Sequence, residues 1–140
     1  MHEIVSCTTR PKREGETDGI NYFYLTIKQF ESEVLNGNML ETTCFNGWLY
    51  GTSYTSLNEN AINIGVFNPA GIESLLSHSN IDVTVYYIDA APKTRLLRQL
   101  NREKNPNVDE IIRRYSADEE DFENLNFDYI YLKNENEKDL

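Results

Sequence analysis

Hydrophobic and polar residues alternate along the chain in short blocks, and the spacing inside each block predicts a helix or a strand. Aromatic and β-branched blocks predict strands at 3–7, 21–25, 39–45, 48–52, 61–67, 81–88 and 129–132. The remaining patterned blocks predict helices at 26–36, 53–60, 70–77, 92–102 and 108–123. Because strands and helices take turns from residue 61 onward, the second half of the chain predicts an α/β fold with parallel strands.

Two local signals refine this pattern in the first half of the chain. Thr26 can cap the helix that follows it, and Gly37 can end that helix. Asn46-Gly47 lies between two strand-like runs and predicts a tight hairpin turn. The first half is therefore expected to contain a small antiparallel sheet together with the helices at 26–36 and 53–60.

At 140 residues, with 39% hydrophobic and 26% charged residues, the composition is that of an ordinary globular protein, and we expect residues 1–140 to form a single domain. No apolar run approaches the ~20 residues that span a bilayer. Met1-His2-Glu3 leads directly into core-like sequence rather than into an apolar signal segment. These features predict a cytoplasmic protein with no membrane partner.

The chain is acidic, with a formal net charge of -10. Because the nucleic-acid backbone attracts basic surfaces, this charge argues against a nucleic-acid partner and favours a protein or a small anion. Cys7 and Cys44 are too few for a disulfide framework or a zinc site. We expect two reduced thiols, with Cys7 half-buried, and no metal site.

One segment near the start of the chain concentrates hydroxyls, arginines and carboxylates. From Ser6 to Tyr22 the chain is S-C-T-T-R-P-K-R-E-G-E-T-D-G-I-N-Y. Arg10, Lys12 and Arg13 form a basic cluster in an otherwise acidic chain, and arginine offers a planar fork of donors to phosphate oxygens. Carboxylates beside such a cluster are suited to orienting a base, so the segment predicts a mononucleotide site.

Arginines also gather on the last two predicted helices. Arg95, Arg98 and Arg102 share one face of the first, and Arg113 and Arg114 lie on the second. Two such helices could close over a polyphosphate. The common outcome of this spacing is instead a solvated network with neighbouring acids, and both interpretations stay open.

Other polar residues gain meaning only as a group, since a single glutamate on a strand edge is usually solvated. His2 and His78 have no acid or nucleophile at motif spacing and are expected at the surface. Asn68-Pro69-Ala70-Gly71 follows an apolar strand, and ligands gather at the carboxyl ends of strands in parallel sheets.

In order and spacing, these features together resemble the guanylate kinase family. The resemblance rests on the run from Ser6 to Tyr22, on Met39-Leu40-Glu41 and Tyr50-Gly51-Thr52 in the hairpin, and on the arginine helices. It implies an α/β fold with a parallel-sheet core like that of P-loop kinases, lacking the P-loop strand and helix. It further implies a small antiparallel GMP-binding subdomain at 22–52 and arginine-bearing lid helices at 93–123.

The resemblance also implies roles for individual residues, with GMP as the substrate. The residues that would read guanine are Ser6, Glu41 and Thr52. Those that would hold its phosphate are Arg10, Arg13, Tyr22 and Tyr50, supported by Glu16, and Asn68 completes the substrate-binding set. Arg98, Arg102 and Arg114 would neutralise the transferring phosphoryl group, and would be catalytic only in an active kinase.

The sequence departs from the family in the part that binds ATP. Guanylate kinases begin with a glycine-rich loop, G-x-x-x-x-G-K-[ST], which these 140 residues do not contain. Where the family has L-D-x-D-x-x-G, Val66 and Asn68 replace the two acids. We therefore expect no cofactor on this chain, with ATP and Mg²⁺ used only if the loop is supplied elsewhere, and no phosphoryl transfer from ATP.

The missing strand would lie in the middle of the family's sheet. Its absence predicts that segments 61–67 and 81–88 pair directly, or that a second chain covers the open edge, with a homodimer as the simplest case.

Three functions follow from this reading. The favoured one is a guanylate-kinase-like pseudoenzyme that binds GMP or dGMP, or uses the pocket for protein recognition, without transferring phosphate. The second is an active guanylate kinase, converting ATP and GMP to ADP and GDP, whose P-loop lies outside this chain. The third is a small inhibitor or nucleotide-sequestering protein, suited to a viral genome, that acts on a host factor.

Overall fold

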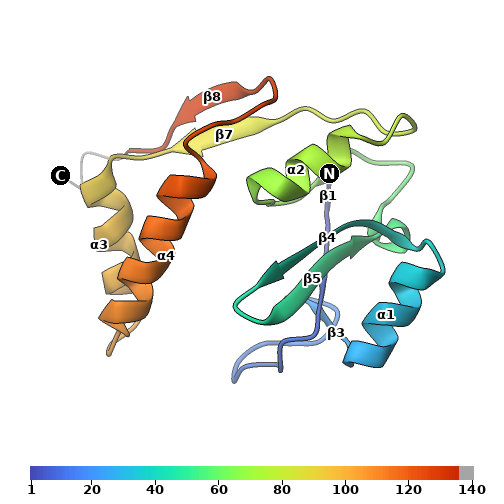
Figure 1. Ribbon diagram of the computed structural model, residues 1–140, viewed down its shortest axis with the longest axis horizontal. Coiled ribbons are helices and arrows are strands. Elements are labelled where there is room, and N and C mark those ends of the chain that lie inside the picture. Colours follow the sequence, from blue (N-terminus) through green and yellow to red (C-terminus); the bar gives the residue numbers. More distant parts are fainter. Residues whose placement is uncertain (136–140) are drawn as a thin grey trace. The chain divides into compact units, whose positions relative to one another are not determined.

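The computed structural model describes residues 1–135 and divides into two compact units, Met1–Ile81 and Asp82–Leu140. The first unit contains β1 (His2–Glu3), β2 (Cys7–Thr8), β3 (Phe23–Tyr24), α1 (Ile27–Leu35), β4 (Met39–Phe45), β5 (Trp48–Ser53), the 3₁₀ turn η1 (Tyr54–Ser56), β6 (Asn63–Ile64) and α2 (Pro69–Leu76). The second contains β7 (Tyr86–Asp89), α3 (Pro92–Arg102), α4 (Val108–Asp121) and β8 (Ile130–Lys133) (Figure 1). The predicted α/β class is confirmed.

The centre of the first unit is a four-stranded sheet in the order β3-β2-β5-β4. β4 and β5 form the predicted antiparallel hairpin, and Asn46 and Gly47 at its tip have φ of 52° and 80°. Two positive φ values in succession are what a two-residue type I′ turn requires, which is why Asn-Gly predicted it correctly. β2 joins the hairpin antiparallel through β5 and pairs parallel with β3.

α1 begins and ends as predicted. The Thr26 hydroxyl accepts from the Gln29 N–H at 3.2 Å, and the Gln29 side chain accepts from the Thr26 N–H at 2.8 Å, which completes a capping box. Gly37 follows with φ of 70°. The helix lies beside the β4–β5 hairpin (Figure 1), with the buried Phe30 ring so close to Gly51 that a Cβ there would lie 3.2 Å from it.

The predicted helix at 53–60 is wrong beyond the single 3₁₀ turn η1. The asparagines that follow bond to backbone groups instead of continuing the helix. The Asn58 N–H donates to the Asn63 side-chain oxygen at 2.8 Å, and the Asn63 amide donates back to the Asn58 carbonyl at 3.0 Å. Side chains that compete in this way for backbone groups favour turns over helices.

The predicted strands at 61–67 and 81–88 are shorter than expected. The observed strands β6 and β7 lie in different units, so direct pairing, or a second chain that covers the open edge, stays a prediction. β6 pairs parallel with β1, and β7 pairs parallel with β8, among the residues that the structure describes. β6 and β7 each pair with their partner strand over their whole length. β7, for example, begins at Tyr86, opposite the first residue of β8. The predicted strand at 3–7 is likewise split into β1 and β2.

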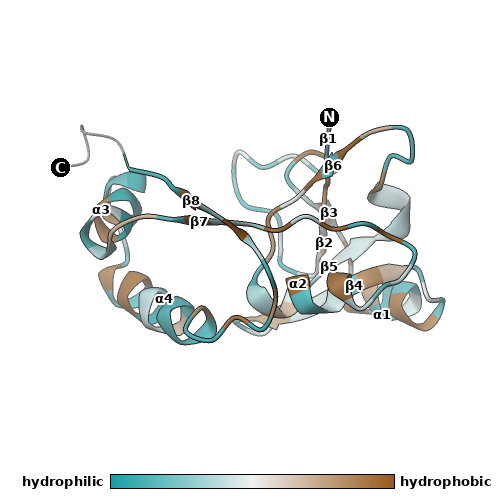
Figure 2. Cartoon of the chain, turned by 90° about the horizontal axis from the view of Figure 1, so that it is seen from above, coloured by the Kyte–Doolittle hydropathy of each residue, from teal (hydrophilic) through white to brown (hydrophobic). Residues whose placement is uncertain are grey.

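In the second unit, the two predicted helices and the last predicted strand are confirmed within a few residues. Tyr87 of β7 stacks on Phe122, which follows α4, with ring centroids 5.6 Å apart. Arg95 of α3 joins α4 by its salt bridge to Glu119 and by lying over the Tyr115 ring. Figure 2 shows hydrophobic and hydrophilic residues side by side on both helices, as expected for helices that bury one face.

Candidate functional site

An ion pair between the buried Arg10 and the half-buried Glu16 lies in the motif that predicts a phosphate site. The Arg10 guanidinium, 8% exposed, donates to both Glu16 carboxylate oxygens at 3.0 and 2.9 Å. Glu16 also accepts from the Arg13 N–H at 2.9 Å and from the Tyr24 hydroxyl at 2.7 Å. The carboxylate therefore fixes the orientation of Arg10 and closes the loop between them.

Three tyrosines surround this pair. The Arg10 guanidinium carbon lies 5.4 Å from the centre of the Tyr22 ring and 5.9 Å from that of Tyr24. Tyr22 meets Tyr50 edge to face at 5.9 Å. Aromatic faces hold a cation in place without neutralising it, so the rings restrict where the Arg10 charge can point.

Tyr24 is a member of this cluster that sequence reasoning missed. The sequence pattern predicts it only as part of an aromatic-rich strand, although Tyr22 and Tyr24 lie two residues apart and their ring centroids are 6.0 Å apart. The period of two along an extended segment could have identified it, since residues i and i+2 lie on one face.

The hydrogen bonds around Glu16 also set its charge. The Arg10 guanidinium, then the Arg13 N–H and the Tyr24 hydroxyl, lower the pKa of Glu16 from 4.5 to about 2. The same contact with Glu16 raises the pKa of Arg10 further above its ordinary value. Both groups therefore stay charged at neutral pH.

A second cluster joins three strand residues by hydroxyl hydrogen bonds. The Thr52 hydroxyl donates to a Glu41 carboxylate oxygen at 2.8 Å, and the Ser6 hydroxyl lies 3.4 Å from that of Thr52. Since the Thr52 proton faces Glu41, Ser6 is the donor in the second bond. Thr52 is 0% exposed and Glu41 is 7% exposed, and burial raises the pKa of Glu41. The structure thus brings Ser6, Thr52 and Glu41 together.

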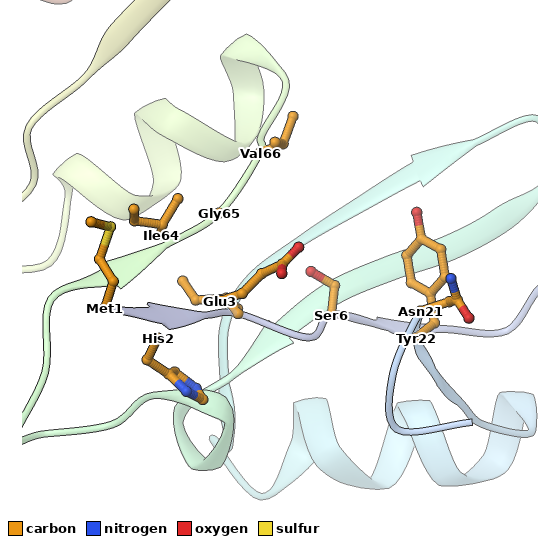
Figure 3. A pocket seen from close by; sticks show the side chains of 10 residues that line it. Met1, His2, Glu3, Ser6, Asn21, Tyr22, Ile64, Gly65 and Val66 are labelled. Atoms are coloured by element: carbon orange, nitrogen blue, oxygen red, sulfur yellow. The ribbon is translucent and has the colours of Figure 1, made fainter. Parts of the chain in front are cut away.

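A cavity of about 410 Å³ connects Ser6 and Tyr22 with the β1 and β6 segments. Its lining includes Glu3, Asn21 and Val66, and Figure 3 shows Ser6 lying between Glu3 and Tyr22. One residue from each cluster therefore borders a single open space in the first unit.

At the start of α2, Asn68 caps the helix, because its side-chain oxygen accepts from the Gly71 N–H at 2.9 Å. Val66, two residues earlier, is 98% exposed. Neither residue offers the carboxylate that stands at these positions in the pattern L-D-x-D-x-x-G.

His2 and His78, both expected at the surface, are hydrogen-bonded to backbone carbonyls. His2 Nε2 lies 2.8 Å from the Ser56 carbonyl oxygen, and His78 Nε2 lies 2.6 Å from that of Leu40. His78 Nδ1 also lies 3.2 Å from the Tyr54 hydroxyl. Both rings are half-buried, because bonds to backbone over a long sequence separation draw them into the unit, and sequence spacing gives no sign of such bonds.

Both cysteines are free thiols, as predicted. Cys7 is fully buried rather than half-buried, because β2 lies between β3 and β5 in the sheet. Burial, with Glu33 and Glu41 nearby, raises the pKa of Cys7 to about 11.

Three arginines of the second unit form ion pairs with acids of α4. Arg95 bonds to Glu119 at 2.6 Å, and Arg113 and Arg114 both bond to Glu110, at 2.8 and 3.1 Å. This agrees with the network interpretation for these three. The roles expected of Arg98, Arg102 and Arg114 at a phosphoryl group stay predictions.

Within residues 1–135, no three His, Cys, Asp or Glu side chains lie together in a way that could hold a metal ion. No helix in that part of the chain is long and apolar enough to cross a bilayer.

Comparison with known proteins gives consistent matches. The family model described as guanylate kinase matches residues 2–140. The guanylate kinase of Thermotoga maritima is 38% identical over 143 residues, covering 96% of this chain and 67% of that protein. That of Chlorobium luteolum is 56% identical over 52 residues, covering 37% of this chain and 26% of that protein.

The fold is similar to that of a solved structure, the guanylate kinase from Anaplasma phagocytophilum, with a TM-score of 0.70 at 21% identity. The match covers 96% of this chain and 66% of that one. The chain thus spans between about a quarter and two thirds of the length of the relatives it matches.

Proposed function

The chain belongs to the guanylate kinase family, and on that premise we propose that its first unit, residues 1–81, binds a guanine nucleoside monophosphate. The observation that carries the proposal is the buried chain of hydroxyls ending at Glu41, in the same unit as the Arg10–Glu16 pair. One cluster suits a base and the other suits a phosphate. The cavity bordered by Ser6 and Tyr22 supports a ligand that reaches both.

At the base end, a carboxylate is the right acceptor for guanine. Guanine presents two adjacent donors, N1–H and the 2-amino group, and adenine does not. Glu41 is held by Thr52 on one oxygen and is largely removed from water. A wrong base would leave the buried carboxylate without its partners, and an unpaired buried polar group is costly, so the site would select guanine.

At the phosphate end, Arg10 supplies the charge and Glu16 sets its direction. The Tyr22 and Tyr50 rings border the same place, and Arg13 follows three residues after Arg10 in the loop. Glu16 is fully engaged by protein donors, which supports a positioning role rather than direct contact with a phosphate anion.

The residues of this chain do not fit Mg²⁺ and ATP. The 140 residues contain no G-x-x-x-x-G-K-[ST], and the Asn68 oxygen is engaged as a helix cap. We therefore propose that this polypeptide by itself binds GMP without transferring phosphate to it.

Phosphoryl transfer is the second candidate. It is favoured by family membership and by the arginines Arg98, Arg102 and Arg114, which the resemblance assigns to the transferring group. It would need a donor-binding loop supplied from outside these 140 residues. The inhibitor hypothesis has no support in the comparisons, and the homodimer, the viral source and the cytoplasmic setting stay predictions.

The proposal is tested by calorimetric titration of the 140-residue protein with GMP, dGMP, AMP and ATP, with a coupled kinase assay on the same sample. We expect GMP and dGMP to bind, AMP and ATP to bind far more weakly, and no turnover. Turnover would favour the kinase, and absence of any nucleotide binding would overturn the proposal.

A further inference from the structure

The strand that carries Glu41 is irregular at the residue before it. Met39 pairs with Ser53 and Glu41 pairs with Thr52, so two steps along β4 match one step along β5. Leu40 is the extra residue of this β-bulge. Consecutive residues of a regular strand point to opposite faces, yet Leu40 and Glu41 are both buried. The bulge thus lies directly beside Glu41, a position at which bulges next to functional sites commonly re-aim a side chain.

His78 holds the carbonyl of that extra residue. Its Nε2 lies 2.6 Å from the Leu40 oxygen, and its ring meets the Tyr54 ring edge to face, with centroids 6.0 Å apart. A carbonyl oxygen can only accept, so Nε2 carries the proton, and Nδ1 forms the hydrogen bond with the Tyr54 hydroxyl. Both ring nitrogens are thus engaged, and the bond from Nε2 is the one that reaches the bulge.

The helix α2, which ends two residues before His78, also packs against the strand that contains the bulge. α2 packs against β4 (Figure 1), and its Gly71 lies so near Glu41 that a Cβ there would be 3.4 Å from a carboxylate oxygen. The first turn of α2 thus borders the Glu41 side chain. His78, two residues after the end of α2, bonds to the Leu40 carbonyl. Thr52 fixes the other carboxylate oxygen from β5.

We propose that His78 is a positioning residue for base recognition: by holding the Leu40 carbonyl it maintains the bulge that aims the Glu41 carboxylate at guanine. The inference rests on the proposed function. His78 has no contact with the substrate in this account and acts only through Leu40 and Glu41.

The test compares three variants. His78→Phe keeps an aromatic ring against Tyr54 but removes the donor to Leu40. His78→Gln keeps a side-chain N–H that can reach the same carbonyl. Tyr54→Phe removes only the hydroxyl at Nδ1 and leaves the Leu40 bond, so it is the matched control.

Affinity is measured by calorimetry for GMP and for IMP, which lacks the 2-amino group. His78→Phe should lower GMP affinity roughly tenfold, the scale of one misplaced buried acceptor, and IMP affinity less, so that the preference for GMP shrinks. His78→Gln should restore most of the preference, and Tyr54→Phe should keep it. Equal losses for GMP and IMP, or no rescue by glutamine, would overturn the positioning role.

A second readout needs no ligand. Carbon-13 NMR titration of the glutamate carboxyls in the folded wild type and in His78→Phe follows Glu41 directly. We expect the pKa of Glu41 to fall toward its ordinary value in His78→Phe, as the carboxylate moves toward water, and to stay raised in His78→Gln. An unchanged Glu41 titration overturns the inference. If the wild type binds no GMP while this shift is found, the proposed function fails and the positioning by His78 stands.

Discussion

At the scale of single residues, the proposed site depends on carboxylates whose environments differ. Glu16 accepts three kinds of donor and its pKa is lowered to about 2, whereas burial raises the pKa of Glu41. Glu16 holds Arg10 in place, whereas Glu41 is the proposed acceptor for guanine. This contrast gives each residue a distinct experimental signature.

Replacing Arg10 removes the charge at the phosphate end. Arg10→Ala should weaken GMP binding by about 2 kcal/mol, roughly thirtyfold, the scale of charge-assisted bonds lost. Guanosine, which has no phosphate, should lose much less. Calorimetry with both ligands measures the difference, and Arg113→Ala, which removes an exposed arginine paired with Glu110, is the matched control. Equal losses for the two ligands would contradict a phosphate role.

Glu16 should also leave a mark on the pH dependence of stability. Its folded-state pKa lies below the ordinary value of 4.5, so its charged form stabilises the folded protein above that pH. This stabilisation is lost as the pH falls from about 4.5 toward 2. Urea unfolding at pH 7, 4 and 3 should therefore show that the free energy of unfolding falls less between pH 7 and pH 3 in Glu16→Gln than in the wild type.

Glu110 provides the control for that experiment. Its pKa is also lowered to about 2, chiefly by Arg113, but it lies in the second unit. Glu110→Gln should also reduce the loss of folding stability in acid while leaving GMP affinity unchanged. Glu16→Gln should reduce both the loss of stability in acid and the affinity for GMP. A Glu16→Gln protein with the acid profile of the wild type would contradict the strength assigned to the Arg10–Glu16 pair.

At the scale of elements, the hairpin and α1 were predictable because their signals are local. Asn46-Gly47 has the backbone freedom that the turn demands, and Thr26 and Gln29 lie at capping-box spacing. The bulge at Leu40 was not predictable, since it depends on a bond from His78, 38 positions along the chain. The lengths of β6 and β7 depend on their partners in the same way.

The capping box gives a test of this local reading. Thr26→Ala should lower the free energy of unfolding by about 1 kcal/mol, because the N–H of Gln29 loses its acceptor. Lys28→Ala, an exposed residue of the same helix, should change it far less. Denaturant unfolding of both variants decides, and equal effects would show that the cap adds nothing specific.

At the scale of the whole molecule, the family resemblance predicted more than local patterns could. The resemblance gave Glu16 a supporting role beside Arg10, and in the structure these two residues form an ion pair. The nucleotide-binding roles of both clusters stay predictions. Tyr24 was missed although it bonds to Glu16 of the motif, and the contacts of His78 were missed because they span 38 and 24 positions along the chain. The arginines of α3 and α4 lie in the second unit, and their part in any phosphoryl transfer stays a prediction.

The most direct test of the central claim is the affinity of GMP for Glu41→Gln, measured by calorimetry beside the wild type and the exposed control Glu59→Gln. Replacing one carboxylate oxygen with an amide donor sets that donor against the donors of guanine. We predict a loss of at least about tenfold for Glu41→Gln, no change for Glu59→Gln, and no comparable loss for AMP. GMP affinity equal to that of the wild type in Glu41→Gln would contradict the account.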